Sequence, residues 1–89
     1  MIGVYIRPAS MTVDQYKSID EQVRAAVGDP EGMLMHSCFS EGESIAIFDV
    51  WESEDAFRAF AAALGPIVEA SGVEPVEPMI VSMIAFQTP

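Results

Sequence analysis

Two kinds of pattern follow each other along the chain: short runs of β-forming residues and longer stretches with apolar positions at helical spacing. Runs rich in β-branched and aromatic residues predict strands at residues 2–6, 33–39, 45–51 and 79–86. Two intervening stretches repeat apolar side chains every three or four residues, which predicts two amphipathic helices. The predicted order of elements is therefore β-α-β-β-α-β.

Helix ends are marked by residues suited to caps and stops. Thr12 and Gln15 have the spacing of a capping box, and Gly28-Asp29-Pro30 ends the first helix. Ser53 is the expected N-cap of the second helix. Gly65-Pro66 predicts an interruption of that helix, with residues 67–70 adding one short turn and residues 74–78 forming an extended linker.

The two central runs are separated by Ser-Glu-Gly-Glu at 40–43, which predicts a hairpin with Glu41-Gly42 as a two-residue turn. Two helical crossovers around a hairpin give a four-stranded antiparallel sheet with both helices on one face. We therefore predict a single ferredoxin-like α+β domain spanning residues 1–89.

The predicted strands lack the alternation of a sheet that has one wet face. Residues 33–35, 45–48 and 79–86 are almost continuously apolar, and 51% of the chain is hydrophobic. The helices cover only one face, so a second copy is the simplest cover for the other. This predicts a homodimer through sheet faces, a dimeric α+β barrel.

The charge and the cysteine content of the chain exclude some classes of binding partner and some kinds of bond. The net charge of −10, with only four Lys and Arg residues, argues against nucleic acid and anionic membranes. Cys38 is the sole cysteine, so no disulfide forms within the chain, and it is expected to be a small buried hydrophobe. No segment has the length of a membrane span or the pattern of a signal peptide, which favours a cytoplasmic location.

The strongest candidate chemistry is a histidine and an aspartate on one sheet face. Pairing Ser40 with Glu43 places His36 opposite Ile47 and diagonal to Asp49. One face then holds the odd-numbered side chains of the third strand and the even-numbered ones of the second, namely Leu34, His36, Cys38, Ile47, Asp49 and Trp51. His36 and Asp49 are candidates for proton transfer. The alternative is a hydrogen-bonded histidine in the core or at the dimer seam.

Aromatic residues are the candidates for substrate binding. Trp51, at the end of a strand, either lines a pocket or packs in the core, and Phe60 belongs to the apolar stripe of the second helix. Tyr5 and Tyr16 have hydroxyls suited to a phenolic or quinone ligand, or they pack. A single histidine among scattered carboxylates does not predict a metal site.

The stretch Asp49-Val50-Trp51-Glu52-Ser53-Glu54-Asp55-Ala56-Phe57 resembles the antibiotic-biosynthesis monooxygenase-like family of dimeric α+β barrel proteins. In that family a strand ending in a Trp-Glu-Ser-like step commonly runs into a helix that begins Glu-x-Ala-Phe. Outside this stretch, the similar pattern consists of Gly32, His36, residues 64–66, Gly72 and a closing apolar strand.

The resemblance implies a homodimer with a cavity in each subunit between sheet and helices. Characterised members oxidise aromatic polyketides or quinols with dioxygen and without metal or flavin, and others degrade heme. The heme-degrading members would carry a tryptophan near Phe60 and an iron-binding histidine near Ala70. Both are missing here, which argues against heme chemistry.

Two functions follow as hypotheses. The first is a monooxygenase-like protein that acts on a small aromatic substrate and needs no cofactor. In this hypothesis His36 is the base, Asp49 orients it, and Trp51 lies against the aromatic ring of the substrate. The second is a non-catalytic dimeric module that binds a small lipophilic ligand or serves in stress response. An enzyme should hold the His36 ring at a cavity wall, whereas a module should bury it.

Overall fold

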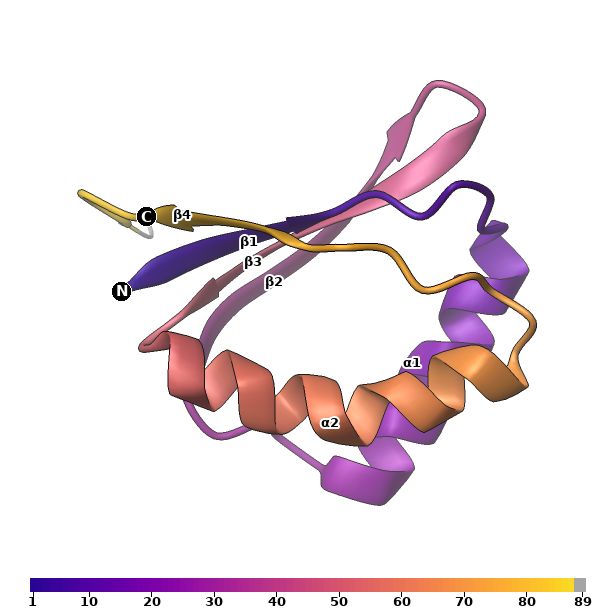
Figure 1. Ribbon diagram of the computed structural model, residues 1–89, viewed down its shortest axis with the longest axis horizontal. Coiled ribbons are helices and arrows are strands. Elements are labelled where there is room, and N and C mark those ends of the chain that lie inside the picture. The colour runs from indigo at the N-terminus through magenta and orange to yellow at the C-terminus, as the bar shows by residue number, and fades with distance from the viewer. Residues whose placement is uncertain (88–89) are drawn as a thin grey trace.

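The computed structural model describes residues 1–87 and confirms the predicted order of elements (Figure 1). The strands and helices, in chain order, are β1 Ile2–Ile6, α1 Val13–Val27, β2 Met33–Glu41, β3 Ser44–Trp51, α2 Glu54–Ala70 and β4 Met79–Ser82.

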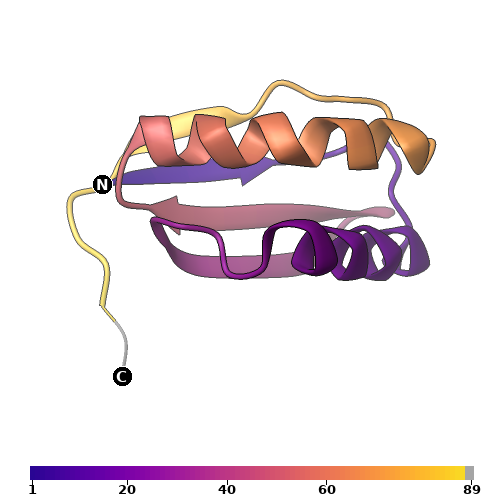
Figure 2. The same ribbon diagram turned by 90° about the horizontal axis from the view of Figure 1, so that it is seen from below.

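The four strands form one antiparallel sheet in the order β2-β3-β1-β4. Figures 1 and 2 show both helices packed on the same face of this sheet. The buried core lies between the two layers. Its members include Val4, Trp51 and Phe57, which form one cluster, and Ile19 and Val23 of α1, which belong to a second. The predicted ferredoxin-like α+β fold is therefore confirmed.

The helix caps also agree with the sequence. The Thr12 hydroxyl accepts a hydrogen bond from the Gln15 backbone N–H at 3.1 Å, and the Gln15 side chain accepts one from the Thr12 N–H at 2.9 Å. The Ser53 hydroxyl accepts from the Ala56 N–H at 3.1 Å. These bonds satisfy backbone donors that the first helical turn leaves unpaired, and so fix where each helix begins.

The hairpin turn was predicted one residue too early. Glu41 pairs with Ser44, so the turn residues are Gly42 and Glu43 rather than Glu41 and Gly42. Gly42 adopts a φ of 62°, which glycine reaches without the steric cost that a side chain would add. The correction changes the pairing by two residues along β3. It therefore preserves which face each side chain occupies and brings His36 directly opposite Asp49.

One residue of the set predicted to share a sheet face with His36 is misplaced. Met33 pairs with Trp51 and Met35 pairs with Val50, so Leu34 is an extra residue at an irregularity in β2. Such a bulge removes one residue from the alternation. Met33, and not Leu34, consequently packs against the core on the helix side.

The predicted interruption at Gly65-Pro66 is also wrong, because α2 continues through both residues to Ala70. Proline removes one backbone donor within a helix and strains the preceding turn. Here the apolar stripe continues past it, since Leu64, Ile67 and Val68 all pack against the core cluster. That packing outweighs the local cost, as tertiary contacts commonly do in helices.

Strand β4 is half as long as predicted. Ser82 pairs with Ile2, the first residue of β1, and the Met83 N–H then bonds to the carbonyl of Met1. The apolar segment 83–86 therefore has no strand beside it within the described residues, and Ile84 is fully exposed. A strand exists only where a neighbouring ladder is available.

Candidate functional site

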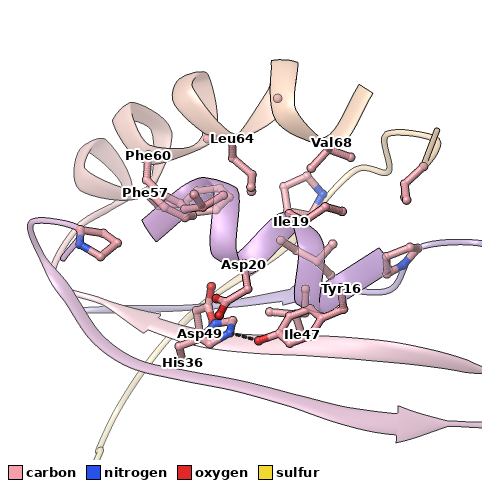
Figure 3. Close-up of a pocket in the computed structure, with 18 of the residues that line it drawn as sticks. Tyr16, Ile19, Asp20, His36, Ile47, Asp49, Phe57, Phe60, Leu64 and Val68 are labelled. Carbon is pink, nitrogen blue, oxygen red and sulfur yellow. Dashed lines mark hydrogen bonds and ion pairs between the residues drawn. The ribbon is translucent and has the colours of Figure 1, made fainter. Parts of the chain in front are cut away.

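A cavity of about 370 Å³ lies between the helices and the sheet. Its wall is built mainly from apolar side chains, among them Ile19, Ile47, Phe57, Phe60, Leu64 and Val68. Figure 3 shows the α2 members of this set pointing toward the sheet. The volume falls in the usual range for small-molecule sites.

His36 and Asp49 meet on the floor of this cavity. They are direct cross-strand partners on β2 and β3, and both line the cavity. His36 Nδ1 lies 2.6 Å from Asp49 Oδ1. The Asp49 side chain is 5% exposed and that of His36 is 31% exposed. The pair thus has a buried carboxylate that orients a ring reachable from the cavity.

Tyr16 completes a chain of three groups. It comes from the first turns of α1, and its hydroxyl oxygen lies 2.6 Å from His36 Nε2 (Figure 3). An ionised carboxylate only accepts hydrogen bonds, so Nδ1 of His36 carries the proton that Asp49 accepts. In the neutral ring Nε2 is then an acceptor, and the Tyr16 hydroxyl donates to it. Both ring nitrogens of His36 are therefore engaged.

The surroundings shift the acid–base properties of this chain. The hydrogen bond to Asp49 is the main cause that raises the pKa of His36, and the partial burial of the ring opposes it. Burial, helped by the negative charges of Asp20 and Asp49, raises the pKa of Tyr16 to about 12. At neutral pH the tyrosine is thus a neutral donor, while the raised pKa of His36 means that its ring keeps a proton to higher pH than a free imidazole would.

Asp20 was not among the sequence candidates. It lines the cavity one helical turn after Tyr16, and its carboxylate accepts from Arg24 Nε at 2.9 Å. The signal that could have found it is the four-residue spacing from Tyr16, which puts the two on one side of α1. The apolar spacing that marks the buried side of a helix does not include an aspartate, so that pattern alone does not single out Asp20.

The structure brings some of the predicted binding residues together and separates others. Tyr16 and Phe60 line the cavity, whereas Trp51 and Tyr5 do not. Trp51 is completely buried, packs against Phe57 and Phe60, and its indole N–H has no hydrogen-bond partner in the structure. Phe57 and Phe60 line the cavity, and Trp51 packs behind them against both rings.

Tyr5 lies on the opposite face of the sheet. Its neighbours along β1, Val4 and Ile6, pack toward the helices, so the alternation of the strand turns Tyr5 outward. Its hydroxyl donates to the Glu41 carboxylate at 2.6 Å, an arrangement that raises the pKa of Tyr5. Tyr5 is therefore not among the residues that line the cavity.

The structure also shows where the cysteine lies and whether the chain holds a metal-binding cluster or a membrane span. Cys38 packs against the core cluster, and burial raises the pKa of its thiol. Among residues 1–87, no three histidine, cysteine or carboxylate side chains are grouped so that they could hold a metal ion. Neither helix in the described part of the chain is long and apolar enough to cross a membrane.

Fold and site together define a ferredoxin-like α+β protein with a cavity on the helix side of its sheet and a Tyr-His-Asp chain at the cavity wall. No family model and no curated protein match the sequence at a significant level. Solved structures do match it in fold.

A mutant of SnoaB, a cofactor-independent oxygenase from Streptomyces nogalater, superposes with a TM-score of 0.67 at 19% identity, covering 96% of this chain and 93% of SnoaB. A putative antibiotic biosynthesis monooxygenase from Chloroflexus aurantiacus gives a TM-score of 0.68 at 14% identity, covering 98% of this chain and 96% of the other. NE2512, a protein of unknown function from Nitrosomonas europaea, gives 0.60 at 20% identity, covering 99% of this chain and 93% of NE2512.

At these identities the similarity establishes the fold and not the activity. The resemblance that the Trp51–Phe57 stretch predicted is thus confirmed at the level of the fold.

Proposed function

We propose that this protein is a cofactor-independent oxygenase that acts on a small, flat phenol or quinol in the cavity beside His36. The observation that carries the proposal is the Tyr16-His36-Asp49 chain, with two contacts of 2.6 Å at the wall of an otherwise mainly apolar cavity. The shared fold with SnoaB, itself a cofactor-independent oxygenase, supports this class of reaction.

The chemistry needs a base and a dry site. Removing the phenolic proton gives an electron-rich phenolate, which can donate an electron to dioxygen. Recombination of the two radicals forms a C–O bond, and loss of water then leaves a quinone. One phenol and one dioxygen thus give one quinone and one water, and the substrate supplies all four electrons that reduce dioxygen. His36 takes the proton and Asp49 stabilises the resulting imidazolium.

Apolar walls serve the same reaction. The side chains of α2 that face the sheet, such as Phe60 and Leu64, offer flat and aliphatic surfaces to an aromatic ring. They also keep water away from the radical pair, because water would exchange protons with the intermediates. The site thus has one polar corner for a hydroxyl and a mainly apolar remainder.

The working unit in this proposal is a homodimer formed through the outer sheet faces. Several apolar side chains are exposed on the face turned away from the helices: Phe39 on β2 at 41%, and Met79 and Val81 on β4 at 60% and 42%. These residues lie on the two edge strands, β2 and β4, so the interaction surface in this proposal spans the whole width of the sheet. A second copy would cover them with the same residues.

The direct test is the replacement His36→Ala in an assay of oxygen uptake with flat phenols. General-base catalysis contributes about 10²–10⁴-fold, so kcat should fall by at least about a hundredfold. Asp14→Asn, on the exposed side of α1, serves as the control and should retain wild-type turnover. Wild-type turnover by His36→Ala would refute the assigned role. Tight binding of phenols without any turnover by the wild type would instead identify a binding module.

A further inference from the structure

The hydrogen bonds of His36 leave a substrate no free nitrogen to approach. Nδ1 is held by Asp49 and Nε2 by the Tyr16 hydroxyl, each at 2.6 Å. Tyr16 and His36 both line the cavity, and their rings lie nearly parallel, with 12° between their planes. Of the two groups bonded to His36, Tyr16 is the one whose hydroxyl can accept from a bound hydroxyl and donate to the ring at the same time.

We propose that Tyr16 is the catalytic residue that accepts the substrate's phenolic proton while its own proton passes to His36 Nε2. This inference rests on the proposed function and deepens it. The substrate O–H bond breaks as a new O–H bond forms on Tyr16. In the same step the original Tyr16 O–H bond breaks and an N–H bond forms on His36. The products are a substrate phenolate, a neutral tyrosine and an imidazolium paired with the Asp49 carboxylate.

The chemistry of a phenol suits this role. A hydroxyl has one donor and two acceptor lone pairs, so Tyr16 can accept from a substrate while it donates to His36. Its pKa of about 12 means that it does not ionise by itself at neutral pH. The two transfers must therefore be coupled, and the raised pKa of His36 makes the ring a better final acceptor. The buried Asp49 carboxylate compensates the charge that appears on the ring.

The competing route is displacement, in which the substrate phenol pushes Tyr16 aside and bonds to Nε2 directly. The two routes make opposite predictions for Tyr16→Phe. In the relay this change removes the hydroxyl that passes the proton from substrate to His36, whereas in displacement it frees Nε2 and removes a competitor. The ring of the phenylalanine still fills the same space, so the cavity wall is retained.

The experiment measures kcat by oxygen uptake and quinone absorbance with phenol, 1-naphthol and 1-anthrol as probes. The proteins are the wild type, Tyr16→Phe, His36→Ala and the double variant, with thermal melting as a check of folding. Tyr5→Phe is the matched control, because it removes a hydroxyl from the other face of the sheet, away from the cavity. A relay predicts that both single changes lower kcat at least about a hundredfold and that the double variant is no slower than either.

A second measurement needs no variant. The wild-type rate in mixtures of light and heavy water should curve with deuterium content, because two protons move in one step, and a straight line would overturn the relay. Wild-type or faster turnover by Tyr16→Phe, with His36→Ala inactive, would also overturn it and leave the proposed function standing. If the loss of kcat in the double variant is the product of the two single losses, the two residues act independently, and the relay is overturned while the proposed function stands. Failure of the wild type on every probe, or full activity of His36→Ala, would refute the proposed function itself.

Discussion

Replacing Phe39 by alanine should weaken the proposed dimer by an amount that the structure allows to be worked out. An aromatic side chain offers roughly 150–250 Å² of surface, so the 41% of Phe39 that is exposed corresponds to about 80 Å². Covering that area contributes about 2 kcal/mol. A two-fold interface contains each residue twice, so the dimer loses about 4 kcal/mol, roughly a thousandfold in Kd.

Sedimentation equilibrium over nanomolar to micromolar concentrations measures this change directly. Val13→Ala is the matched control, because Val13 is 53% exposed but lies on α1, on the other side of the sheet. It should leave Kd within a factor of two or so, as surface changes outside an interface usually do. A wild-type protein that stays monomeric and folded at micromolar concentration would refute the dimer. An unchanged Kd for Phe39→Ala would show that the dimer uses another surface.

Two further predictions concern the site and its scaffold. Asp49→Asn removes the main cause of the raised pKa of His36, so the pKa of this ring should fall, which NMR of the sole histidine can follow. The rise of kcat with pH should then move to lower pH as well. The stability that the charged pair contributes is complete below the unfolded pKa of about 6.5 and is lost as pH rises through the folded pKa, so Asp49→Asn should destabilise more at low pH. Gly32→Ala should cost about 2–4 kcal/mol in urea unfolding, because φ is +86° and the new Cβ would lie 2.7 Å from that of Ala56.

The faces of the strands could be predicted from the sequence, but the neighbours across them could not. Side chains alternate with a period of two, so an error of two residues in the pairing of β2 with β3 left His36 and Asp49 on the helix side. The exact partner depends on which residue takes the positive φ in the turn. Gly42 takes the first turn position, and this converts a diagonal pair into a direct one.

The contact between Tyr16 and His36 lay beyond sequence reasoning for a different reason. Helical period assigns Tyr16 to the apolar stripe of α1, but the height of a helix over a sheet is set by the packing of all its side chains. A hydroxyl and an imidazole that meet at 2.6 Å depend on that height. The position of Trp51 was equally undetermined, because a strand end beside a helix can lie in the core or at a cavity wall.

The register of β3 links the two roles that we propose for the sheet. Phe48 and Asp49 are adjacent and point to opposite faces, Asp49 into the cavity and Phe48 toward Gly3 on the outer face. A slip of one residue would exchange them, placing a carboxylate in the dimer interface and an aromatic ring beside His36. Point substitutions such as Phe39→Ala and His36→Ala should therefore separate association from turnover, whereas a change that moves the turn at Gly42 should damage both together.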